Sequence, residues 1–214
     1  MNDRRDPVSD DTDEFSQPDA IDAYCVTCRQ TVPMDHPEPV WTRRGSAATR
    51  GECPVCGTTV FRIGHTPAHD ALERPAPVRV GERPAGKLAV ETVFVNYSVA
   101  DAGFSEQLAA DLNRIGVPTF MAEDTAGDVR WATGVHPALV ECKRMIVVLS
   151  PLAAQTASVV EAWEFFEQRR KPIVVAQAAP ADLPDALRRK PRFDFAGADY
   201  KRAFRELVQA LTRR

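Results

Sequence analysis

Two short apolar stretches decide the fold, Val93-Phe94-Val95-Asn96-Tyr97-Ser98 and Met145-Ile146-Val147-Val148-Leu149-Ser150. Both are rich in β-branched residues, and both end in small polar residues. Continuous apolar runs of this length are typical of strands that are buried on both faces of a parallel sheet. Ligands of such sheets bind beyond the carboxyl ends of the strands. The sequence therefore predicts a nucleotide-sized pocket beside these two runs.

Strands and helices alternate around these two runs, over residues 90–214. Further strands are predicted at 117–121, 172–176 and 193–195, and helices at about 104–115, 135–141, 158–170 and 200–211. The helices are predicted from apolar residues at helical spacing, and Gly116 ends the first of them. Five short strands with intervening helices indicate an α/β domain with a flavodoxin-like, five-stranded parallel sheet.

Four of the five cysteines form two CxxC pairs, Cys25 with Cys28 and Cys53 with Cys56. Four thiolates at this spacing are typical of a closed, tetrahedral zinc site, and Gly57 suits the turn after the second pair. The alternatives are a redox motif, which would not need two copies, and a disulfide-stapled loop. Residues 23–65 are too few to be stabilised by a core alone. We therefore predict a zinc ribbon at 23–65, with Zn²⁺ as its structural cofactor.

The remaining segments are predicted from composition. Residues 1–22 are acidic and nearly devoid of large apolar groups, so we expect a disordered tail, and four prolines in residues 66–89 indicate a linker. The net charge is only −3, and no apolar run is long enough to span a membrane. We expect no membrane partner. The cysteine usage indicates a reducing compartment, so we expect a cytoplasmic protein.

The predicted hairpin between the two CxxC pairs carries Arg43, Arg44 and Arg50, near Trp41. Arginines on a zinc ribbon can contact a phosphate backbone. Exposed arginines more often form a solvated face, however, so we do not expect nucleic acid as a partner. The three histidines at 36, 65 and 69 are not needed as ligands, because four cysteines already complete the predicted site.

Residues 23–64 carry the pattern YCVTCR, followed by GECPVCGTTVFRIG, and resemble a small prokaryotic zinc-ribbon family. That resemblance implies a fold and a metal. A second set of boxes follows: the run 93–98 with Asp101, then Gly116-Val117, then Gly127 and Trp131 with the run 145–151, then 171–175. In this order and at these spacings, residues 91–211 resemble the Toll/interleukin-1 receptor (TIR) domain.

The TIR resemblance implies a prokaryotic protein of signalling or immune defence, which associates with other TIR domains as a homo-oligomer. Many prokaryotic TIR domains cleave NAD⁺ at the nicotinamide–ribose bond, with a glutamate on the helix after the third strand. Alignment on Trp163 puts Ala162 in that place, and Glu161 lies one residue earlier, rotated by about 100°. NAD⁺ is thus a candidate substrate, with Glu161 as the candidate catalytic residue.

Two alternatives stay open at this point. In an enzyme, Glu161 would reach inward, and the nucleotide would contact Tyr97, Ser98, Trp131 and Ser150. In a non-catalytic adaptor, Glu161 would face solvent, and the zinc ribbon would be a second docking surface.

Several of the same side chains have a purely structural interpretation as well. Tyr97 can cap the core, Trp131 can anchor its loop, and Asp101 is expected to N-cap the first helix. His136 is expected at the surface, and Cys142 is expected to be an inert core thiol.

Overall fold

The structure is a computed structural model that describes residues 20–80, 91–121, 129–197 and 199–212. Residues 1–19 of the predicted tail and 81–89 of the predicted linker lie outside the described residues. The chain divides into two compact units. The first comprises Met1–Glu38 and Thr49–Ile63, and the second comprises Pro39–Ala48 and Gly64–Arg214.

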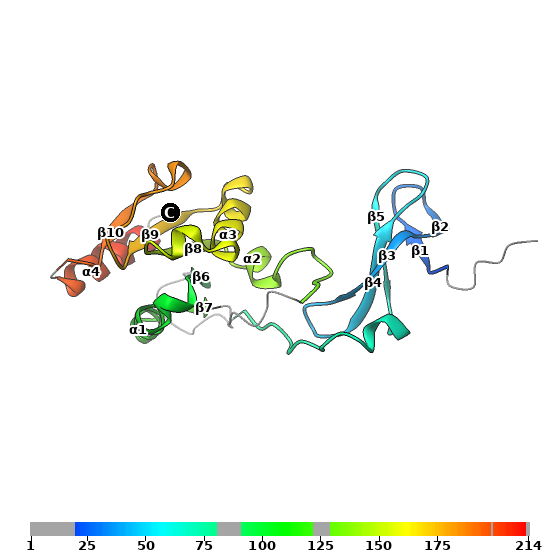
Figure 1. Cartoon of the computed structure of the whole chain (residues 1–214), viewed down its shortest axis with the longest axis horizontal. Coiled ribbons are helices and arrows are strands. Elements are labelled where there is room, and N and C mark those ends of the chain that lie inside the picture. The colour runs from blue at the N-terminus through cyan, green and yellow to red at the C-terminus, as the bar shows by residue number, and fades with distance from the viewer. Residues whose placement is uncertain (1–19, 81–90, 122–128, 198, 213–214) are drawn as a thin grey trace, which may run out of the picture. The chain divides into compact units, whose positions relative to one another are not determined.

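A five-stranded parallel sheet forms the centre of the second unit (Figure 1). Its strands are β6 (Val93–Asn96), β7 (Thr119–Met121), β8 (Arg144–Leu149), β9 (Ile173–Gln177) and β10 (Arg192–Asp194). They lie in the order β10-β9-β8-β6-β7, and every neighbouring pair is parallel. The chain enters at β6 and reverses direction across the sheet between β7 and β8. This order confirms the predicted flavodoxin-like α/β fold.

Helices cover both faces of the sheet, as a fully apolar strand requires. They are α1 (Ala102–Arg114), α2 (Pro137–Glu141), α3 (Ala157–Gln168) and α4 (Tyr200–Thr212), with short 3₁₀ turns η1 (Pro67–His69), η2 (Val99–Asp101), η4 (Ala153–Gln155) and η5 (Asp185–Leu187). Side chains that alternate along β6 enter two separate cores. Phe94 packs in the core with α2 and α3, and Val93 and Val95 pack in the core with α1 and α4.

The end of α1 sets where β7 begins. Gly116 has φ +85°, and its N–H donates to the Asn113 carbonyl at 3.0 Å. The N–H of Val117 reaches back to the Leu112 carbonyl at 2.9 Å. This pair of bonds is the Schellman motif, in which a left-handed residue closes a helix. Because Val117 belongs to this turn, the strand starts two residues later than the sequence predicts.

The first unit is built from short strands around a small core, as predicted. Its elements are β1 (Asp22–Cys25), β2 (Gln30–Pro33) and β5 (Thr59–Ile63), together with parts of β3 (Asp35–Trp41) and β4 (Ala47–Glu52). β1 and β2 are antiparallel, and the second sheet has the order β3-β4-β5. Gly51 allows a close approach there, because a Cβ at this position would lie 2.7 Å from the Asp35 carbonyl oxygen.

Candidate functional site

The two CxxC turns bring four thiols together in the first unit. All four Sγ atoms lie within 4.8 Å of one another, with Cys25 and Cys56 at 3.6 Å and Cys28 and Cys53 at 3.9 Å. Sulfur atoms about 2.3 Å from a tetrahedral zinc ion stand about 3.8 Å apart, so these separations fit that ion. The four cysteines are therefore positioned to bind a metal ion, and the donor set is compatible with Zn²⁺.

The backbone makes the same turn at each CxxC pair. Arg29 (φ +57°) and Gly57 (φ +68°) directly follow the two pairs, and both adopt the left-handed conformation. Their N–H groups donate to the carbonyls of Cys25 and Cys53, at 2.7 and 2.8 Å. The N–H of Cys28 points at the Sγ of Cys25 at 3.4 Å, as expected of a turn that cradles a metal-bound sulfur. The conformation expected of Gly57 is thus present.

Hydrogen bonds shift the pKa values of two of the four thiols in opposite directions. The Cys56 Sγ lies 3.2 Å from the Thr58 hydroxyl, and hydrogen bonds from Thr58 to the sulfur lower the pKa of Cys56 to about 6. Hydrogen bonding with Cys56 raises the pKa of Cys28 to about 12. A cation at this site displaces these protons, because metal ions bind cysteine as thiolate. Metal binding is therefore expected to release protons.

In the second unit, the carboxyl ends of β6 and β8 meet at one carboxylate. The hydroxyls of Ser98 and Ser150 both donate to Oδ2 of Asp101, each at 2.7 Å, and both serines are buried. The Ser150 Oγ also accepts from the N–H of Ala153 at 3.1 Å. Asp101 stands at the N-cap position of α1, but its side chain makes no capping bond. The expected capping role was wrong, because the carboxylate turns to the two serines instead.

The other two predicted nucleotide contacts lie in different cores. Tyr97 is partly buried and packs with the α1 and α4 core, whereas Trp131 is 6% exposed and packs with the α2 and α3 core. The structure therefore brings Ser98 and Ser150 together and separates Tyr97 from Trp131. Nucleotide contact by these four residues stays a prediction.

The loop that carries Trp131 is held by the backbone of the β3–β4 hairpin. The N–H of Trp41 donates to the Arg130 carbonyl at 2.7 Å, and the N–H of Ala132 donates to the Trp41 carbonyl at 2.8 Å. The Trp131 ring meets His136 edge-on at 5.4 Å. Its buried indole N–H has no hydrogen-bond partner among the described residues. The loop is therefore held through the backbone of Arg130 and Ala132, and the Trp131 ring is buried beneath it.

The helix α3 presents apolar residues to the sheet and carboxylates to solvent. Ala162 and Trp163 are 6% and 3% exposed, whereas Glu161 and Glu164 are exposed. The amide of Asn96 donates to the Val159 carbonyl at 2.8 Å and ties β6 to this helix. The side chain at the buried position of α3 is therefore the methyl group of Ala162, and not a carboxylate. A catalytic role for Glu161 stays a prediction.

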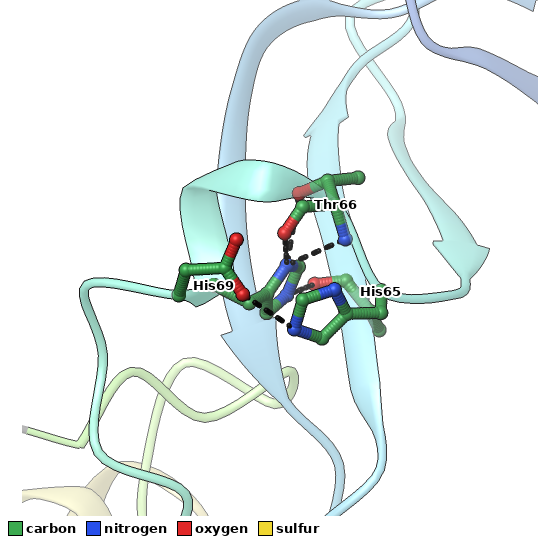
Figure 2. Close-up of polar contacts among 5 residues, drawn as sticks. His65, Thr66 and His69 are labelled. Atoms are coloured by element: carbon green, nitrogen blue, oxygen red, sulfur yellow. Dashed lines mark hydrogen bonds and ion pairs between the residues drawn. The ribbon is translucent and has the colours of Figure 1, made fainter.

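His69 is a structural residue that the sequence pattern did not reveal. It is buried, and Nε2 donates to the Ala48 carbonyl at 3.0 Å (Figure 2). Its Nδ1 accepts from the Thr66 N–H at 3.1 Å and from the Thr66 hydroxyl at 2.8 Å. The ring also meets Trp41 edge-on at 5.4 Å. The run Thr66-Pro67 with a polar residue three positions after Thr66 is a helix-start signal that could have located it.

Two further predictions concern His136 and Cys142. His136 is half-buried rather than at the surface: its Nδ1 accepts from the Ala138 N–H at 3.2 Å, and burial lowers its pKa. This N-cap satisfies the first turn of α2 behind Pro137. Cys142 is buried, and burial raises its pKa to about 12. It is the inert core thiol that the sequence predicts.

Comparison with known proteins gives two family matches. Residues 24–63 match a domain of unknown function (DUF5679), and residues 93–208 match the TIR domain. Among solved structures, the chain is similar to the TIR domain of the Toll-related receptor TRR-2 from Hydra magnipapillata. The identity is 23%, the match covers 56% of this chain and 98% of that one, and the TM-score is 0.48. No curated protein matches this chain.

No helix within the described ranges is both long enough and apolar enough to cross a bilayer. The TIR model accounts for more than half of the sequence, and it begins at the first residue of β6. This chain therefore belongs to the TIR domain family, and its four clustered cysteines lie within the DUF5679 region.

Proposed function

We propose that this chain is a signalling protein whose TIR domain acts by associating with other TIR domains, and not by cleaving NAD⁺. A TIR domain supports a function of the signalling or immune type. The observation that carries the proposal is the buried methyl group of Ala162, beside the exposed Glu161. Cleavage of a glycosidic bond needs a carboxylate placed against an oxocarbenium-like charge. A misplacement of about 1 Å already costs about a hundredfold in rate.

The serines at the strand ends support the same proposal. Ser98 and Ser150 already donate their hydroxyl protons to Asp101. A ribose at this position would have to compete with a charged acceptor for both hydroxyls. Hydrogen bonds to a charged group contribute about 1.5–3 kcal/mol each, so the exchange is costly. The polar groups at the end of the sheet therefore support the fold and not a ligand.

The four cysteines would hold Zn²⁺ as a structural ion. Four thiolates fill a tetrahedral shell and leave no open position for a substrate. The core of the first unit contains six buried residues, two of them cysteines of the cluster. A metal in such a unit stabilises the fold directly, because the unfolded chain does not hold the four sulfurs together. The zinc-bound unit would then be a rigid second docking surface.

The test is nicotinamide release from NAD⁺ by the zinc-loaded full chain across a concentration series. Glu161→Gln and Glu164→Gln make a matched pair, since both side chains are exposed on α3. We expect no release from any of the three proteins, together with self-association in analytical ultracentrifugation. Release that rises with protein concentration and is lost only in Glu161→Gln would establish the enzyme instead.

A further inference from the structure

Charge is distributed very unevenly along this chain. Residues 143–214 hold fourteen lysines and arginines against eight acidic residues, a net charge of +6. Residues 1–142 carry the opposite excess, −9, so the overall value of −3 conceals a basic C-terminal third. Such an asymmetry within one chain is typical of a surface that meets an anionic partner.

Three basic runs account for most of this excess, and the fold brings them to one edge. They are Lys143-Arg144, Arg169-Arg170-Lys171 and Arg188-Arg189-Lys190 with Arg192. Each run stands at the start of a strand, β8, β9 and β10 respectively, and these strands are parallel neighbours. Neighbouring strands lie about 4.8 Å apart. The nine cations therefore gather at the amino edge of the sheet, which we name the basic edge.

The basic edge contains a hollow of about 420 Å³ between the ends of α3, β9 and α4. Arg144, Arg170, Lys171 and Lys190 line it, with Glu167 as the single acidic residue. Glu167 pairs with Lys190 at 2.5 Å. The lining therefore contains four basic residues and one acidic residue.

Capping of helix ends explains only part of the basic edge. Lys171 donates to the carbonyls of Leu139, Val140 and Cys142 at 2.7–2.9 Å, which closes the end of α2. Arg169 lies over the Phe165 ring at 3.9 Å, at the end of α3. In the run that precedes β10, Arg188 follows η5 and pairs with Asp185 at 3.1 Å, and Lys190 pairs with Glu167. Arg189 and Arg192 of this run are exposed. Helix ends and these ion pairs therefore explain only part of the run.

The backbone of Arg170 adopts a left-handed conformation that is unusual for arginine. The helix α3 ends in the same motif as α1: the N–H groups of Arg170 and Lys171 donate to the carbonyls of Glu167 and Phe166, each at 2.9 Å. At α1 the left-handed position holds Gly116, and at α3 it holds Arg170 with φ +53°. Glycine takes this conformation without strain, and arginine does not. Arg29 adopts the same conformation within a CxxC turn, whereas Arg170 adopts it at an exposed helix end where glycine would be less strained.

We propose that the basic edge binds the phosphate backbone of a nucleic-acid duplex without reading its sequence. Six of the nine cations are arginines, whose guanidinium groups bind phosphate oxygens in pairs. This inference rests on residues other than the arginines between the CxxC pairs, from which no nucleic-acid partner was expected. It is also independent of the function proposed above.

The chemistry of the edge favours a duplex over other anionic partners. Among the described residues, the exposed large apolar side chain nearest in sequence to the three runs is Val140 of α2, a single side chain that is 40% exposed. A membrane surface needs an apolar anchor beside its basic residues, and a protein interface needs an apolar centre. Among the described residues of the second unit, no aromatic ring is exposed to stack on unpaired bases, which a single strand would require. Duplex contacts are polar and strongly positive, as here.

The test is fluorescence anisotropy of labelled DNA and RNA duplexes with the zinc-loaded full chain, over a salt series. The test variant combines Arg170→Gly with Arg189→Gln. The matched control combines Arg79→Gly with Arg62→Gln, two exposed arginines that belong to none of the three runs. We expect the test variant to weaken binding equally for duplexes of different sequence and to reduce the salt slope by about two. The control should bind like the parent.

Arg170→Gly keeps the result interpretable, because it relieves backbone strain and should raise the midpoint of thermal unfolding. Weaker duplex binding by a more stable protein cannot come from misfolding. The proposal is overturned if the parent does not retain duplexes at low salt, or if the control loses as much affinity as the test variant. Tighter binding to phosphatidylserine vesicles or to polyglutamate than to either duplex would also overturn it.

Discussion

The hydroxyl of Ser150 donates a 2.7 Å hydrogen bond to Asp101, a residue 49 positions earlier in the chain. The same Oδ2 accepts from Ser98, so one carboxylate oxygen holds the ends of two strands. Both serines are nearly inaccessible to water. Their hydroxyls therefore depend on Asp101 for an acceptor.

Removing this acceptor should destabilise the fold. Asp101→Ala is expected to lower the free energy of unfolding by about 2–3 kcal/mol, since two buried hydroxyls would lose a charged partner. Ser150→Ala removes one donor and should cost about 1 kcal/mol. Urea-induced unfolding followed by circular dichroism measures both. Equal stability of Asp101→Ala and the parent would show that the carboxylate is not a structural link.

Metal content is the direct check on the four cysteines. We expect one zinc ion per chain, lost on treatment with a strong chelator, with a rise in amide exchange over residues 23–63. Serine at any of the four positions should release the metal. Cys142→Ser is the matched control, because Cys142 is buried in the second unit, and it should keep the ion. Retention of zinc by a serine variant such as Cys53→Ser would contradict the predicted ligand set.

Acid should weaken the loop that contains His136. Burial lowers the pKa of this histidine from 6.5, so the folded state favours its neutral form. The stabilisation is therefore present above about pH 6.5 and is lost as the pH falls below that value. The unfolding free energy of the parent should fall between about pH 6.5 and 5 more steeply than that of His136→Asn, which keeps an N-cap acceptor. Parallel pH profiles for the two proteins would rule this out.

The two helix ends allow a pair of substitutions with opposite signs. Gly116→Ala should cost about 1 kcal/mol, because a Cβ at φ +85° is strained although no atom lies within 4 Å of it. Arg170→Gly should gain about 1 kcal/mol at the equivalent position of α3, less the added entropy of glycine in the unfolded chain. Differential scanning calorimetry measures both shifts. A change of the same sign in both variants would mean that side-chain contacts, and not backbone strain, decide these ends.

Most of the fold could be predicted because its signals are local. The apolar run at 145–150 became β8 (Arg144–Leu149), and the helical spacing at 158–170 became α3 (Ala157–Gln168). The strand expected at 117–121 was shortened to Thr119–Met121 by a helix-closing turn. The two CxxC pairs likewise carry their geometry within four residues each. Periodicity and spacing capture features of this kind.

The features that were missed depend on distant partners. His69 bonds to Ala48, 21 residues away, and no local pattern identifies that carbonyl. Ser98 and Ser150 donate to Asp101, whose position in the sequence predicts a helix cap instead. The residues of the basic edge form three separate runs in the sequence. Only the strand order β10-β9-β8 places these runs together. The sequence therefore identifies the individual residues of these arrangements, but not the distant residues that they contact.

The attachment of the Trp131 loop has a consequence for sequence change. Trp41 holds this loop through main-chain atoms of residues 130 and 132, so the bonds do not depend on the side chains there. A saturation mutagenesis scan should find Arg130, which is exposed, tolerant of nearly every replacement. The buried rings of Trp41 and Trp131 should tolerate almost none. The chain can thus vary the outer surface of this loop while the loop keeps its position.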